Sequence, residues 1–111
     1  MPVFPEFIDQ LPQIDLDLPG VTGRLLQAKD HQVAFFRFDQ ETVVPDHSHG
    51  AQWEVVIAGE VVLRTGGEEH NYQAGDSFFI AAGQVHGAIV RAGFQSVAFF
   101  VQADRYTIRS G

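Results

Sequence analysis

Two histidines separated by one residue, His47 and His49, are the side chains whose type and spacing most directly indicate chemistry. On a β-strand, residues i and i+2 point to the same face, so a strand here would place both imidazoles side by side. Imidazole is the commonest metal ligand among protein side chains, and two rings on one face can bind one ion. A solvated histidine pair at a strand end is the alternative that this spacing alone leaves open.

The composition restricts what kind of site this is. There are no cysteines, which excludes disulfides, thiolate-bound metal clusters and a catalytic thiol. Any metal must therefore be held by histidine and oxygen ligands. Fourteen acidic residues against seven Lys and Arg give a formal net charge of −7, the reverse of the balance typical of proteins that bind duplex nucleic acid or anionic membranes. We expect a small-molecule partner, no nucleic acid and no membrane.

The chain from Gly20 onward is predicted to be a single all-β domain. Short apolar or alternating runs recur along it, separated by turn signals such as Gly66-Gly67 and Ala82-Gly83. Strands at this regular spacing are typical of a sandwich or small barrel. The predicted strands are 21–28, 33–38, 42–45, 53–57, 60–64, 70–73, 77–80, 85–90 and 95–102.

Residues 1–19 are predicted to form an extended N-terminal arm, with the domain spanning 20–111. Prolines at positions 2, 5, 12 and 19 disfavour a helix, including over 6–14, the one window that otherwise suits one. The arm is too apolar for a free tail, so we expect it to lie across the domain or a neighbouring subunit. No basic region followed by an apolar one begins the sequence and no apolar run could cross a bilayer, so a cytoplasmic location is expected.

Two stretches of the sequence resemble the two motifs of the cupin superfamily. The first lies between Pro45 and Gly59 and resembles Gly-x5-His-x-His-x3–4-Glu-x6-Gly, although Glu41 replaces its leading glycine. The second lies between Gly75 and His86 and resembles Gly-x5-Pro-x-Gly-x2-His. The order and separation of the two motifs match the family. The resemblance implies a double-stranded β-helix, or jelly-roll barrel, similar to small single-domain bacterial cupins of the RmlC-like type.

The resemblance also implies a metal site in which His47, His49 and His86 are ligands. Its fourth ligand is ambiguous, because counting back from Gly59 selects Gln52 whereas counting forward from His49 selects Glu54. Strand register is fixed by pairing and by the terminal turn, whereas loops absorb deletions. We therefore predict Gln52, whose carbonyl oxygen can bind a metal.

Glu54 has the same strand parity as Gln52 and is expected to face the barrel interior. A carboxylate is rarely buried there without a partner. Glu54 is our candidate catalytic residue, a proton-transfer group beside the ion. The two alternatives are that it ligates the ion itself or that it lies at the rim without a role.

The predicted cofactor is a divalent transition metal: zinc, nickel, manganese, iron or copper, among which these ligands do not discriminate. Three neutral imidazoles and a neutral amide leave the charge of the ion uncompensated, which favours Lewis-acid chemistry on an anionic or oxygen-rich metabolite. Cupins with a His-His-Gln-His set include a group that opens or ketonises unsaturated uronates, so we expect a lyase or isomerase acting on a sugar acid or enol. A metal-dependent dioxygenase and a non-catalytic binding or sensing cupin are the alternatives. The metal-free epimerase type of cupin fits poorly, because histidines already occupy the ligand positions.

The remaining candidate residues have simpler interpretations. His31 and His70 are expected at the surface. Adjacent phenylalanines on predicted strands should place one ring in the core and the other on the outer layer. Trp53 has the opposite parity to the predicted ligand, which favours a subunit interface, and we expect a homodimer. Arg105 either binds a carboxylate at the barrel mouth or is a solvated charge near the chain end.

Overall fold

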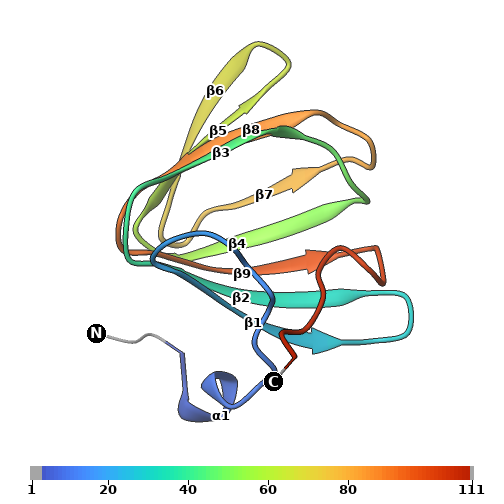
Figure 1. Ribbon diagram of the computed structural model, residues 1–111. Coiled ribbons are helices and arrows are strands. Elements are labelled where there is room, and N and C mark those ends of the chain that lie inside the picture. The colour runs from blue at the N-terminus through green and yellow to red at the C-terminus, as the bar shows by residue number, and fades with distance from the viewer. Residues whose placement is uncertain (1–3, 111) are drawn as a thin grey trace.

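The computed structural model describes residues 4–110, and within them the chain forms nine strands and one short helix (Figure 1). Each of the nine predicted runs forms a strand. The elements are α1 (Glu6–Asp9), β1 (Val21–Gln27), β2 (Gln32–Phe38), β3 (Thr42–His47), β4 (Gln52–Ala58), β5 (Glu60–Thr65), β6 (Glu68–Gln73), β7 (Ser77–Ile80), β8 (His86–Val90) and β9 (Phe94–Phe100). No helix in the described part of the chain is long and apolar enough to cross a membrane.

The strands form two antiparallel sheets that lie one above the other (Figure 1). One sheet has the order β1-β2-β9-β4-β7 and the other β3-β8-β5-β6. Strands that are distant in sequence are therefore neighbours: β4 pairs with β9 and β7, and β8 pairs with β3 and β5. This arrangement confirms the predicted all-β jelly roll.

Alternation along the strands separates the core from the outer face, as predicted. Phe36, Phe78 and Phe100 are buried, and each such ring stabilises the fold by about 1.5–3 kcal/mol. Their neighbours Phe79 and Phe99 are 64% and 43% exposed on the other face. The two inner faces thus enclose an apolar interior.

Gly59 fixes the end of β4. Its φ of 76° lies in the left-handed region, where a side chain is strained, and an added Cβ would lie 2.7 Å from the Cα of Phe94. The turn between β4 and β5 therefore needs glycine. The placement of Gln52 is set by its pairing with Ile80 and Phe100, because a register irregularity separates Val56 from Ala58 near this turn.

The prediction of a wholly extended arm was wrong at one turn, because Glu6–Asp9 form the helix α1. Pro5 stands at its N-cap, where a missing N–H costs nothing, and the helix ends before Pro12. Beyond α1 the arm is extended. The N–H of Ile14 donates to the carbonyl of Gly23, and Ile14 also forms an isolated bridge with Ile108. Because Ile14 is 1% exposed, this part of the arm belongs to the core.

Candidate metal centre

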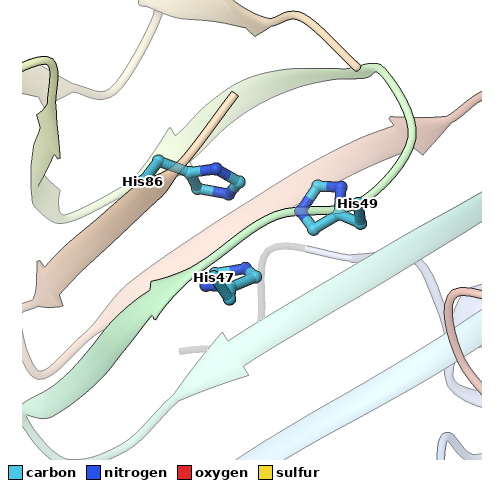
Figure 2. Close-up of side chains that lie close together, drawn as sticks. All are labelled: His47, His49 and His86. Carbon is cyan, nitrogen blue, oxygen red and sulfur yellow. The ribbon is translucent and has the colours of Figure 1, made fainter. Parts of the chain in front are cut away.

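His47, His49 and His86 come together in the folded chain. Their potential ligand atoms all lie within 4.8 Å of one another, and the ring centroids are 4.3–5.1 Å apart. His47 ends β3 and pairs in register with His86, which begins β8. Figure 2 shows the three rings gathered around a common space.

The prediction that strand parity brings His47 and His49 together was only partly right. β3 ends at His47, after a register irregularity that begins at Val44, so His49 lies in the following loop rather than on the strand. The loop is held in place by two hydrogen bonds: the N–H of Gly83 donates to the His49 carbonyl, and that of Gly50 donates to the Gln102 side chain. Loop geometry, and not strand parity, therefore brings His49 to the other two histidines.

Each of the three imidazoles is oriented by a backbone carbonyl at its Nδ1. The distances are 2.9 Å from His47 to Pro45, 2.7 Å from His49 to Gly50 and 2.8 Å from His86 to Gln84. A carbonyl oxygen only accepts, so Nδ1 carries the proton and the lone pair of the neutral ring is on Nε2. Such carbonyl contacts are typical of metal-binding histidines. The donor set therefore fits a divalent transition metal.

The surroundings also keep two of these rings neutral. Burial is the main cause that lowers the pKa of His49 to about 4, and the charge of Arg105 lowers it further. The pKa of His86 is lowered mainly by burial and also by His47 and Arg105. Because metal binding requires an unprotonated nitrogen, both shifts favour ligation at neutral pH.

Gln52 and Glu54 are both buried on the inner face of β4, with exposed fractions of 7% and 8%. Nε2 of Gln52 donates a 2.6 Å hydrogen bond to Oε1 of Glu54. This bond engages the amide nitrogen and leaves the Gln52 carbonyl oxygen available to a ligand. In the described part of the chain, no carboxylate joins the three-histidine cluster.

Glu54 is a carboxyl group whose charge is disfavoured by its position. Burial raises its pKa from 4.5 to about 7, while the hydrogen bond from Gln52 opposes the shift. Near neutral pH both protonation states are therefore populated. This is the property expected of a proton-transfer group.

The three histidines, Gln52 and Glu54 line one cavity of about 410 Å³ between the sheets. The volume is suited to a small metabolite. Away from these residues the wall is largely apolar. Its apolar lining consists of Leu16, Leu18, Val21, Phe36, Phe38, Val44, Val61, Leu63, Phe78, Ile80, Ala88, Val90 and Phe94.

The contribution of the two chain ends to the cavity wall was not predicted from the sequence, apart from that of Arg105. The arm contributes Leu16 and Leu18, and the segment after β9 contributes Tyr106 beside Arg105. The sequence predicts only that the arm lies across the domain or a neighbouring subunit. A hydrogen bond from the Asp15 N–H to the Thr107 carbonyl joins the two segments. No local sequence pattern predicts this contact.

The residues expected at the surface lie there. His31 and His70 are exposed, and His70 contacts the Glu68 carboxylate at 3.3 Å. Trp53 is 44% exposed on the outer face of its sheet, opposite to Gln52 and Glu54. Arg105 is half-buried at the cavity wall rather than solvated.

Comparison with solved structures identifies similar folds at low sequence identity. An RmlC-like cupin from Shewanella frigidimarina is 23% identical, with a TM-score of 0.76, covering 95% of each chain. KdgF from Halomonas sp. is 22% identical, with a TM-score of 0.70, covering 82% of this chain and 87% of that one. Salicylate 1,2-dioxygenase from Pseudoaminobacter salicylatoxidans, described with gentisate adducts, is 16% identical with a TM-score of 0.68, covering 78% of this chain and 26% of that one. At these identities the likeness shows the fold alone.

The family was also tested on the sequence itself. No curated protein matches the chain. The family model of the cupin domain matches residues 34–101, which include both motifs and all three clustered histidines. Because this match covers more than half of the chain, the protein belongs to the cupin superfamily.

Proposed function

We propose that this cupin is an enzyme that uses a divalent transition metal as a Lewis acid on a small anionic or oxygen-rich metabolite. The observation that carries the proposal is the set of three imidazoles whose Nδ1 atoms are all bound to backbone carbonyls. His47, His49 and His86 thereby offer three Nε2 lone pairs at the wall of the cavity between the sheets. Zinc, nickel, manganese, iron and copper all accept such ligands.

Gln52 is the proposed fourth ligand, through its carbonyl oxygen. Its Nε2 hydrogen bond to Glu54 supports this assignment, because it leaves the oxygen as the free end of the amide. Four neutral donors leave the +2 charge uncompensated, so a bound metal would polarise an anionic or enediol-like substrate. The chain orients these ligands, and the rest of the cavity wall is largely apolar.

Glu54 is the proposed proton-transfer residue. It lies in the same cavity wall as the histidines, and burial raises its pKa, so its carboxyl group is poised to exchange a proton with a substrate held in the cavity. The proton would be held on a carboxyl oxygen, steadied by the Gln52 amide. This pairing suits lyase or isomerase chemistry on an enol or sugar-acid type of substrate.

A dioxygenase is the second candidate. It would be favoured if Glu54 left its bond with Gln52 and ligated the ion, because the charge of the site would then fall to about +1 and suit oxygen chemistry at iron or manganese. The structural likeness to salicylate 1,2-dioxygenase is compatible with this alternative. A binding or sensing cupin without turnover is the third.

Metal content of the purified protein tests the proposal most directly. We expect about one metal ion per chain by mass spectrometry, with an anomalous signal at the three histidines. His86→Ala should lose the ion, whereas His70→Ala, a histidine on the exposed strand β6, should keep it. Protein purified with ample metal that holds no ion would refute the metalloenzyme.

Two variants then separate the reaction types. Gln52→Ala should lower metal affinity more than Glu54→Ala, whereas the reverse order would assign Glu54 as the ligand. Turnover of enol and sugar-acid substrates, followed with manganese, iron, nickel or zinc, should proceed without oxygen uptake. Oxygen consumption coupled to substrate loss would favour the dioxygenase, and binding without turnover would favour the sensor.

A further inference from the structure

We propose that the cavity binds a carboxylate with an apolar body, in which Arg105 receives the carboxylate and the apolar wall receives an aryl or alkyl group. The inference rests on the proposed function in one respect, namely that the remaining polar end of this substrate faces the metal. It narrows the substrates proposed above to enol-type acids with an apolar body, because the apolar wall disfavours a polyhydroxylated sugar acid.

Arg105 is an arginine at the cavity wall that has no anionic partner. Arg64, Arg91 and Arg109 each contact a carboxylate, at 2.8, 2.8 and 3.8 Å. No ion pair involves Arg105 within residues 4–110, and its Nε is buried without a hydrogen-bond partner. A half-buried guanidinium without a carboxylate partner at a cavity wall is suited to an anion supplied by a ligand.

The aromatic side chains beside Arg105 hold its guanidinium in place. Its Cζ lies 4.4 Å from the ring centroid of Tyr106 and 6.0 Å from that of Phe100. Stacking occupies the flat faces of the guanidinium and leaves its N–H edges, which match a carboxylate in two parallel hydrogen bonds. The Phe100 ring also contacts the His49 ring at 5.4 Å, so the arginine and the histidine cluster share one aromatic neighbour.

The rest of the wall determines what the carboxylate is attached to. Polar lining residues outside the metal site are confined to the arm and the segment after β9: Asp15, Arg105, Tyr106 and Thr107. Asp15 already contacts Arg109. Deeper in the cavity, side chains such as Phe36, Val61 and Phe94 offer no hydrogen bonds to sugar hydroxyls. Each hydroxyl buried against them would lose its bonds to water without replacement, whereas an aryl or alkyl group would gain from burial.

Calorimetric titration with three compounds tests this inference. 3-Phenylpropionate carries both proposed features, 3-phenylpropan-1-ol lacks the charge, and galacturonate carries the charge on a polyhydroxylated body. We expect 3-phenylpropionate to bind at least tenfold more tightly than either of the others. Arg105→Met should weaken 3-phenylpropionate at least tenfold without changing the alcohol, and Arg105→Lys should restore part of the loss.

Arg91→Met is the matched control, because it removes an exposed arginine that pairs with Glu41 and should leave all affinities unchanged. The inference would be overturned if galacturonate bound more tightly than 3-phenylpropionate. It would also be overturned if Arg105→Met and the unmodified protein bound 3-phenylpropionate equally well. The titrations are repeated after chelation. If the protein holds no metal as purified and still binds 3-phenylpropionate after chelation, the carboxylate site stands and the proposed function fails. If the protein holds metal but does not bind 3-phenylpropionate, the carboxylate site fails and the proposed function stands.

Discussion

Glu54→Gln is predicted to stabilise the metal-free protein increasingly as the pH rises. Burial raises the pKa of Glu54 from 4.5 to about 7, so the folded protein binds this proton more tightly than the unfolded chain does. A group of this kind adds no penalty below pH 4.5, where it is protonated in both states. Its penalty grows between pH 4.5 and 7 and is complete above that range. The amide introduced by the substitution would keep an acceptor for Nε2 of Gln52 and remove the charge.

The size of the effect follows from the two pKa values. The difference between 4.5 and about 7 corresponds to about 3 kcal/mol of unfolding free energy. The buried histidines act with the opposite sign: the lowered pKa values of His49 and His86 reduce stability as the pH falls below 6.5. Both proteins carry these histidines, so their contribution cancels in the difference between Glu54→Gln and the unmodified chain.

Urea unfolding at several pH values between about 4 and 8.5, with chelator present, measures this difference. We expect the stability of Glu54→Gln relative to the unmodified protein to rise by about 3 kcal/mol from about pH 4 to pH 8. Glu69→Gln, an exposed glutamate on β6, is the control and should leave the pH dependence unchanged. A difference that is flat across this range would show that Glu54 titrates as it does in the unfolded chain, and the proton-transfer role would lose its physical basis.

Three further variants test the fold and the assembly. Ile14→Ala should cost about 2–5 kcal/mol in urea unfolding, because its side chain is fully buried against the domain; a cost below about 1 kcal/mol would mean that the arm is dispensable. Gly59→Ala should lower stability by more than about 1 kcal/mol, because alanine would be strained at this left-handed φ and its Cβ would clash with the Phe94 backbone; an unchanged Tm would contradict this. We propose that the chain dimerises through the outer face around Trp53 and Phe79, so light scattering should find a dimer that Trp53→Glu with Phe79→Glu converts to a folded monomer. A monomeric unmodified protein would refute the dimer.

A continuous row of apolar side chains on the outer face of the five-stranded sheet supports this dimer. In the register of the five-stranded sheet, Leu26 pairs with Val33, Val33 with Phe99, Phe99 with Trp53, and Trp53 with Phe79. One apolar row thus crosses all five strands, and most of its members are exposed. A second copy presents the same row. A stable interface requires about 800 Å² from each partner, and a row as wide as the sheet provides a suitable centre for one.

The strands and the two motifs could be predicted because their signals are local. Alternation with period two places Phe78 inward and Phe79 outward whatever the partner strand is, and the turn at Gly59 needs its glycine for backbone reasons alone. The same parity argument placed Gln52 and Glu54 together in the interior. It failed for His49, which lies beyond the end of β3, although the motif still identified it.

The part of the cavity wall that the chain ends supply could not be predicted, because it depends on contacts between distant segments. The proximity of Ile14 and Ile108 arises from pairing between the arm and the segment after β9, and neither segment carries the alternating pattern of a strand. The short helix α1 was missed for a related reason. Prolines exclude a long helix, but a single turn fits between Pro5 and Pro12.

The distribution of charge connects the acidic composition to the site. Of the fourteen acidic residues, all within the described part of the chain, only Glu54 is buried, and its raised pKa shows that the interior resists its negative charge. The cavity instead presents the unpaired Arg105 and the histidines that would hold a cation. The proposed carboxylate ligand would therefore approach a surface of its own sign and bind at Arg105 inside the cavity. Added salt should raise the association rate, because it screens the repulsion between the acidic surface and an anionic ligand. The dissociation rate should change less, because partly buried charge pairs are screened less than exposed ones.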